Sequence, residues 1–262
     1  MYAFDIETPT TIADAVAALK ADEAQPLGGG QTLIPTLKAR LAAPSKLISL
    51  ARVADMQGVS VAGDTLRIGG ATTHATVASD AAQSYPGLAA LAGHIGDPAV
   101  RNRGTIGGSI ANNDPAACYP AAALASGATI VTDTREIAAD DFFVGMFETA
   151  LAEGEIVTAV SFPIPQAANY QKFVQPASRF SLVGVFVAKY ADGVRVAVTG
   201  ASEGGVFRWT EAEQALSSDF SADALKDLSV SADGMISDLH GTGDYRAHLV
   251  KVMTGRAVKA AG

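Results

Sequence analysis

The amino-acid sequence predicts an α+β protein built in two parts. Up to about residue 162, short apolar runs typical of strands alternate with amphipathic helical stretches. Two prolines in Pro163-Ile164-Pro165 then interrupt regular strand pairing. Beyond them, apolar and polar residues alternate as in antiparallel strands, and three helical patterns follow. We therefore expect one domain over 1–165, with lobes at about 1–55 and 56–165, and a C-terminal sheet-and-helix domain over 166–262.

The first lobe is expected to follow the order β-α-β-α-β. Thr10 or Thr11 can cap its first helix, because a hydroxyl there can accept a hydrogen bond from a free backbone N–H. Pro35 fits an early position of its second helix. The expected elements are a strand over 1–8, a helix to about 21, a strand before residue 28, a helix over 33–42 and a strand over 46–50.

The second lobe begins with a hairpin around Gly63-Asp64, and the C-terminal domain contains another at Ala191-Asp192-Gly193. In the second lobe we expect strands over 59–62, 65–68, 129–132 and 156–162, with helices near 73–79, 86–95 and 116–126. In the C-terminal domain we expect strands over 170–174, 181–190, 194–199 and 206–209, with helices over 210–217, 221–227 and 242–258.

The composition of the chain argues against several kinds of partner and binding site. The net charge of −8 argues against a nucleic-acid partner, which usually meets a basic surface. A single cysteine, Cys118, excludes an internal disulfide and an iron–sulfur cluster held by cysteines of this chain alone. The four histidines are too scattered to suggest a metal site. No apolar run reaches the ~20 residues of a membrane span, and the start lacks a basic signal segment, so we expect a cytoplasmic protein.

Two glycine-rich turns suggest a cradle for a pyrophosphate: Gly28-Gly29-Gly30-Gln31-Thr32 and Thr105-Ile106-Gly107-Gly108-Ser109. Glycine lets backbone N–H groups approach an anion closely, and a helix N-terminus adds further donors. Neither turn is a dinucleotide-binding Rossmann fingerprint or a P-loop, and an ordinary surface turn is the alternative. Valine at position 29 or 107 is then expected to block the anion while leaving the fold largely intact.

The charged residues between these turns are open to two interpretations. Arg101 and Arg103 can assist an anion, or they can belong to a solvated loop or a structural ion pair. No hydrolase nucleophile elbow and no convincing acid–base pair occurs in the sequence. This pattern is consistent with a protein whose cofactor carries the chemistry.

Four sequence runs resemble, in the same order, the FAD-binding medium subunit of the molybdenum hydroxylases, the family of the carbon monoxide dehydrogenase medium subunit and the flavin domain of xanthine dehydrogenase. The runs are GGGQTLIPTLKARLAAPSKLISL, IGDPAVRNRGTIGGSIANNDPAACYPAAALASGA, FFVGMFETALAEGEIVTAVSFP and YQKFVQPASRFSLVGV. They span roughly residues 27 to 186. The resemblance implies a two-lobed PCMH-type FAD-binding domain over 1–165 and the usual C-terminal domain of a medium subunit.

The resemblance also implies which residues hold FAD. The two turns would line the pyrophosphate and ribityl chain, Lys172 would lie near the flavin, Val157 would pack on it, and Phe180 would stack beside the isoalloxazine or be an ordinary core residue. Cys118 stands where relatives often carry an aspartate that helps bind the cofactor. The implied set is Gly28, Gly29, Gly30, Gln31, Thr32, Leu33, Thr105, Ile106, Gly107, Gly108, Ser109, Asp114, Cys118, Val157, Lys172 and Phe180, with no catalytic residue and no metal ligand.

By the same resemblance, the chain is an electron-transfer subunit of a dimer of heterotrimers. A small subunit would carry two [2Fe–2S] clusters and a large subunit the molybdenum cofactor and the substrate site. Electrons would reach FAD here and leave to an acceptor that the sequence does not identify. The alternatives are a self-contained FAD-dependent oxidoreductase of similar fold and a dinucleotide-binding scaffold without redox function.

Overall fold

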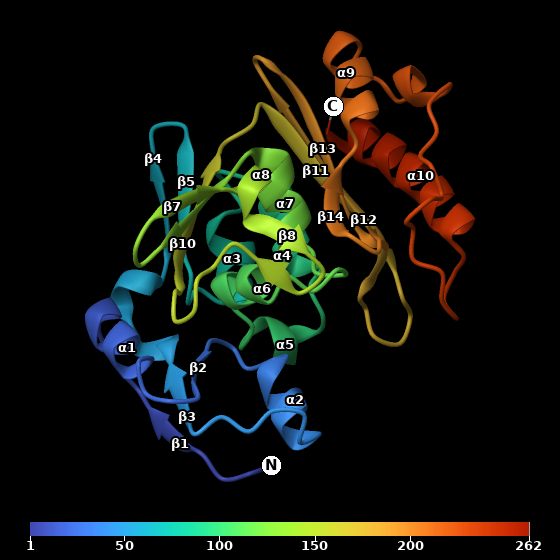
Figure 1. Cartoon of the computed structure of the whole chain (residues 1–262). Helices are drawn as coiled ribbons and strands as arrows, with labels where there is room; N and C mark the ends of the chain where they lie inside the picture. Colours follow the sequence, from blue (N-terminus) through green and yellow to red (C-terminus); the bar gives the residue numbers. More distant parts are fainter. Residues whose placement is uncertain (262) are drawn as a thin grey trace.

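The computed structural model describes residues 1–261 and shows two lobes followed by a C-terminal sheet with its own helices (Figure 1). The first lobe has a three-stranded parallel sheet in the order β1-β3-β2. Its elements are β1 (Asp5–Glu7), α1 (Ile12–Ala18), β2 (Ala24–Leu27), α2 (Leu33–Lys38) and β3 (Lys46–Ser49), followed by the 3₁₀ turns η1 (Leu50–Arg52) and η2 (Ala54–Met56). The expected β-α-β-α-β order is present, but β1 is shorter than residues 1–8.

The first lobe is built around a small apolar cluster. Thr11 caps α1 by accepting a hydrogen bond from the N–H of Asp14 at 3.1 Å. Ala15 of α1 packs with Ile48, Val53 and Met56 under the sheet, and all four are buried. This cluster is separate from the main core, but it also contains Ala71 and Ile156 of the second lobe, so apolar packing as well as loops joins the two lobes.

The second lobe contains a five-stranded sheet in the order β4-β5-β10-β6-β7, with every neighbouring pair antiparallel. Its strands are β4 (Val59–Ala62), β5 (Thr65–Gly69), β6 (Thr129–Thr132), β7 (Glu136–Ala138) and β10 (Val157–Pro163), with a small hairpin of β8 (Phe143–Gly145) and β9 (Glu148–Thr149). Its helices are α3 (His74–Asp80), α4 (Pro86–Gly93), α5 (Pro98–Arg101), α6 (Ile106–Asn112), α7 (Tyr119–Ser126) and α8 (Ala139–Phe142). Six of these elements were not expected from the sequence: α5, α6, α8, β7, β8 and β9.

The C-terminal sheet is antiparallel, in the order β11-β12-β13-β14, and it lies between the helices of the second lobe and the long helix α10 (Figure 1). Tyr170, Phe186 and Ala197 face the second lobe and share its core, whereas Val185 and Val198 face α9 and α10. The elements are β11 (Ala167–Val174), β12 (Ser181–Tyr190), β13 (Gly193–Ser202), β14 (Gly205–Arg208), α9 (Thr210–Ser218), the 3₁₀ turn η3 (Ala222–Leu225) and α10 (Gly243–Ala261).

The chain leaves the five-stranded sheet at Pro163, the last residue of β10, and enters the C-terminal sheet at Ala167, the first residue of β11. The apolar core nevertheless continues across this point, because side chains of the C-terminal sheet belong to the same buried cluster as those of the second lobe. Division of the chain into domains at 1–165 and 166–262 remains a proposal, and the shared core indicates that the two parts would separate only at a large cost in buried apolar area.

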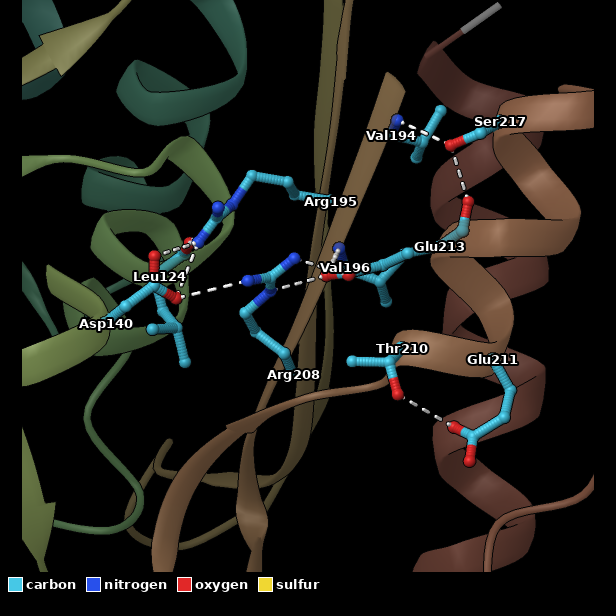
Figure 2. Close-up of polar contacts among 10 residues, drawn as sticks. All are labelled: Leu124, Asp140, Val194, Arg195, Val196, Arg208, Thr210, Glu211, Glu213 and Ser217. Atoms are coloured by element: carbon cyan, nitrogen blue, oxygen red, sulfur yellow. Dashed lines mark hydrogen bonds and ion pairs between the residues drawn. The ribbon is translucent and has the colours of Figure 1, made fainter. Parts of the chain in front are cut away.

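A polar network also ties the C-terminal sheet to the second lobe (Figure 2). Arg195 of β13 donates to both carboxylate oxygens of Asp140 at 2.8 and 2.7 Å and to the carbonyl of Leu124 at 2.8 Å. Arg208 of β14 pairs with Asp140 at 3.3 Å and with Glu213 at 2.6 Å. The buried Glu213 carboxylate also accepts from the N–H of Val196 at 2.9 Å.

Glu213→Ala should therefore destabilise the protein by about 2–3 kcal/mol, because it leaves the Val196 N–H and the Arg208 guanidinium without their main acceptor in a largely buried place. Glu211→Ala is the matched control: Glu211 is exposed and accepts only a long 3.4 Å bond from Thr210. Urea unfolding measures both variants, and the free energy of unfolding of the control should stay within about 0.5 kcal/mol of that of the original protein. Equal effects of the two substitutions would contradict a stabilising role for the network.

Candidate functional site

A cavity of about 740 Å³ lies where the two lobes and the C-terminal sheet meet. Its wall is made by the loop after β2, the start of α6, the segment after α6, the stretch before β10, and the end of β11 with the loop that follows. Its volume is within the range of small-molecule sites. The residues expected from the sequence line this cavity with the exception of Ile106, which is buried in the core of the second lobe.

The first glycine turn offers a row of free hydrogen-bond donors. Among residues 1–261, no acceptor is found for the backbone N–H groups of residues 29–33, all of which line the cavity. Gly30 has a φ of +71°, a conformation that favours glycine, and Gln31 donates its side-chain amide to the carbonyl of Gly29 at 3.0 Å. Consecutive N–H groups facing a cavity form an anion-binding concavity. This turn therefore fits the diphosphate of a dinucleotide.

The second glycine turn also lines the cavity, Ile106 excepted, but its backbone N–H groups are not free. It forms the first turn of α6, and its N–H groups already have partners within the protein. Ile106 donates to the carbonyl of Thr72 at 3.1 Å, Gly107 to that of Gly70 at 2.9 Å, and Gly108 to the hydroxyl of Thr105 at 3.2 Å. The N–H of Ser109 donates to the carbonyl of Thr105 at 3.0 Å. The turn contributes a wall of the cavity, with its donors directed to the protein itself.

Close packing of backbones explains the glycines at 29 and 107. A Cβ on Gly29 would overlap the carbonyl oxygen of Arg103 and lie 2.5 Å from the Cα of Gly104. A Cβ on Gly107 would lie 2.6 Å from the carbonyl oxygen of Gly70. The expectation that valine at either position leaves the fold largely intact is therefore wrong, because each glycine lets two segments of backbone touch.

Gly29→Ala should lower the free energy of unfolding by about 2 kcal/mol or more, since one methyl group must push the first-lobe loop away from residues 103–104. Gly93→Ala is the control: Gly93 lies in α4, and a Cβ there meets no atom within 4 Å. Chemical denaturation should show the control to be unchanged or slightly stabilised. A stable Gly29→Ala protein would contradict this packing argument.

The remaining expected residues lie around the far part of the cavity. Lys172 donates its Nζ to the carbonyl of His94 at 3.1 Å, and Asp114 accepts from the N–H of Ala116 at 2.8 Å. Val157 is buried in the wall, whereas Phe180 is 48% exposed at the rim and is no ordinary core residue. Cys118 is 4% exposed, and its Sγ lies 3.7 Å from the hydroxyl of Ser181, so its thiol packs inward.

The two arginines between the turns, Arg101 and Arg103, are not among the residues that line the cavity. Arg101 donates to the carbonyls of Ile95 and Gly96, each at 3.0 Å, a structural role that differs from the ion pair expected as one alternative. Arg103 contributes its backbone to the contact with Gly29. The basic side chains that line the cavity are those of Lys172 and Arg179.

Two titratable residues of the wall, Glu155 and His74, were not among the site residues expected from the sequence. Glu155 accepts from Arg135 at 3.0 Å and from the hydroxyls of Thr132 and Thr134 at 2.6 and 2.8 Å. The Arg135 guanidinium holds the pKa of this carboxyl well below its usual range, so Glu155 is a charged structural anchor. His74 is 5% exposed, and burial, with a smaller contribution from Arg101, lowers its pKa to about 4. Neither residue stands in a recognisable motif.

The described residues, 1–261, contain no group of three or more histidine, cysteine, aspartate or glutamate side chains placed to hold a metal ion. In the same part of the chain, no helix has the length and apolar character needed to cross a membrane.

Comparison with known proteins agrees with the geometry. Residues 2–165 match the family described as "FAD binding domain in molybdopterin dehydrogenase". The chain is 37% identical to the nicotine 6-hydroxylase medium subunit of Paenarthrobacter nicotinovorans, over 97% of this chain and 96% of that one. It is 32% identical to the carbon monoxide dehydrogenase medium chain of Afipia carboxidovorans, over 98% and 96%.

Solved structures give the same result. Quinoline 2-oxidoreductase from Pseudomonas putida superposes with a TM-score of 0.88 at 29% identity, covering 99% of this chain and 96% of that one. Reconstituted CO dehydrogenase from Oligotropha carboxidovorans gives 0.89 at 30% identity, covering 99% and 97%. The fold and cavity define a flavin-binding subunit of an oxidoreductase. The chain belongs to the family of FAD-binding medium subunits of the molybdenum hydroxylases, which are enzymes of several subunits.

Proposed function

We propose that this chain holds FAD in the cavity with its diphosphate on the free N–H groups of residues 29–33. The observation that carries the proposal is that row of donors beside a cavity of dinucleotide size. Local donors are the appropriate device for a protein of net charge −8, which offers little general attraction to an anion. The start of α6 and Asp114 would then border the chain that joins the diphosphate to the flavin.

The C-terminal part of the wall would hold the flavin itself. Lys172 and Arg179 would place positive charge near it, and Phe180 would offer an exposed aromatic face for stacking. FAD, when bound, supplies a redox centre that accepts electrons and passes them to an external acceptor. The carboxylates that line the cavity are held by the protein: Asp114 by its own turn and Glu155 by Arg135. The cavity thus offers no free acid–base pair to support a self-contained oxidoreductase.

We further propose that the electrons come from partner subunits in a dimer of heterotrimers. A small subunit would carry two [2Fe–2S] clusters and a large subunit the molybdenum cofactor with the substrate site. The single cysteine of this chain supports this arrangement, because such clusters need about four thiolates. The curated relatives are themselves named as a medium subunit and a medium chain. We place this assembly in the cytoplasm.

Binding should be visible at individual amides. On addition of FAD to the apo chain, the N–H groups of residues 29–33 should become protected from hydrogen exchange, because they gain an acceptor only then. The N–H groups of 106–109 should be protected in both states, since their acceptors lie within the protein. Nuclear magnetic resonance of the apo and FAD-loaded chain measures both. Unchanged exchange at 29–33 with stoichiometric FAD bound would move the diphosphate elsewhere.

The chain purified with its natural partners should contain iron and molybdenum, and the same chain purified alone should contain FAD but neither metal. Elemental analysis of the two preparations, with size determination by light scattering, tests this. Acid precipitation of either should release FAD into the supernatant, because nothing in the site calls for a covalent bond. A metal-free monomer that rapidly oxidises a small substrate would favour the self-contained oxidoreductase.

A further inference from the structure

His74 lies at the wall of the cavity, behind the first glycine turn. It is the first residue of α3, and Thr73 caps that helix by accepting from the N–H of Thr76 at 3.3 Å. The backbone N–H of His74 donates to the carbonyl of Gly104 at 2.9 Å. These two bonds fix the backbone at the point where the imidazole leaves it.

The edge of the His74 ring occupies the space where residue 104, a glycine, lacks a side chain. A Cβ on Gly104 would lie 2.5 Å from Nε2 and 2.8 Å from Cδ2 of His74. The Cα of Gly104 is in turn one of the atoms, with the carbonyl group of Arg103, against which Gly29 packs. Gly104 therefore lies between the Nε2 edge of the imidazole and Gly29, and it packs against both. This arrangement places the imidazole close to the turn with the free donors.

Neither ring nitrogen of His74 has a hydrogen-bond partner among the described residues. Nδ1 is completely buried, whereas Nε2 is not, and His74 is one of the residues that line the cavity. On its other side the ring meets Tyr119, with ring centroids 5.3 Å apart. A side chain that is 95% buried and lacks any partner is uncommon in a folded protein, because an unpaired buried polar group is costly.

Burial keeps this imidazole neutral near pH 7, since it lowers the pKa to about 4. A neutral imidazole carries one proton and so offers one donor. With the proton on Nε2, the donor is the nitrogen that reaches the cavity. The missing partner is then an acceptor inside the cavity, next to Gly104.

We propose that His74 is a binding residue for the dinucleotide, donating a hydrogen bond from Nε2 to an oxygen of its diphosphate. This inference rests on the proposed function, because it takes the acceptor to be the group bound by the first glycine turn. The N–H groups of residues 29–33 hold the diphosphate from one side, and His74 contacts it beside Gly104. The bond gives Nε2 of the imidazole a partner and fixes the diphosphate along the turn.

The test compares His74→Gln, His74→Asn and His74→Phe in the full chain, stripped of flavin and titrated with FAD. Glutamine can place an N–H near the position of Nε2, asparagine cannot, and phenylalanine keeps the ring without a donor. We expect the Gln variant to bind FAD within about threefold of the original chain and the Asn and Phe variants to bind about tenfold more weakly, the loss of one hydrogen bond. Titration with riboflavin, which has no diphosphate, should show no difference among the three.

Phosphorus-31 nuclear magnetic resonance of bound FAD provides a second measurement. If His74 had only a packing role, the diphosphate signals would not depend on the residue at position 74. The diphosphate signals of the Gln variant should match those of the original chain, and those of the Asn variant should shift. Equal FAD affinity and unchanged diphosphate signals in all three variants would overturn the role of His74 and leave the proposed function intact. Equal weakening in all three, with glutamine failing to rescue, would assign His74 to packing. Failure of the unsubstituted chain to bind FAD would overturn both proposals.

Discussion

The contact between Gly29 and the backbone of residues 103–104 is the constraint on which the site depends. The first lobe packs on the second through an apolar cluster that includes Ala71 and Ile156, and its glycine turn is placed where the two backbones touch. Gly104 extends the contact inward to His74, and Gly107 makes a similar contact with Gly70 on the adjoining wall. Because none of these contacts has room for a Cβ, the shape of the cavity is determined by backbone packing.

The polar groups of the site divide into those already satisfied and those that are not. The N–H groups at the start of α6, the carboxylates of Asp114 and Glu155, and the guanidinium of Arg101 all have partners within the protein. The N–H groups of residues 29–33 and the imidazole of His74 have none among the described residues. Donors that line a cavity and have no acceptor in the protein are available to a ligand. This division separates the wall of the site from the part that recognises the ligand.

Much of the fold could be predicted from the sequence, and the missing parts have physical reasons. The long strands β12 and β13 and helix α10 carry clear periodic patterns and were expected close to their observed bounds. Helix α6 was missed because Gly107 and Gly108 are poor helix formers, and only the tertiary contact with Gly70 makes glycine suitable there. The resemblance brought together the residues of the cavity, with Ile106 as the exception. It could not show which N–H groups are free, because this depends on acceptors distant in sequence, such as Thr72 and Gly70.

The loop between β11 and β12 closes the outer rim of the cavity and is held by its own atoms. The N–H of Gln175 donates to the carbonyl of Phe180 at 3.0 Å, and that of Arg179 to the carbonyl of Gln175 at 2.8 Å. The strands on either side are joined directly by the pairing of Val174 with Ser181. A loop of another length or composition could therefore be grafted between those two residues without altering the sheet or the glycine contacts. This part of the rim is thus structurally independent of the glycine contacts that shape the opposite end of the cavity.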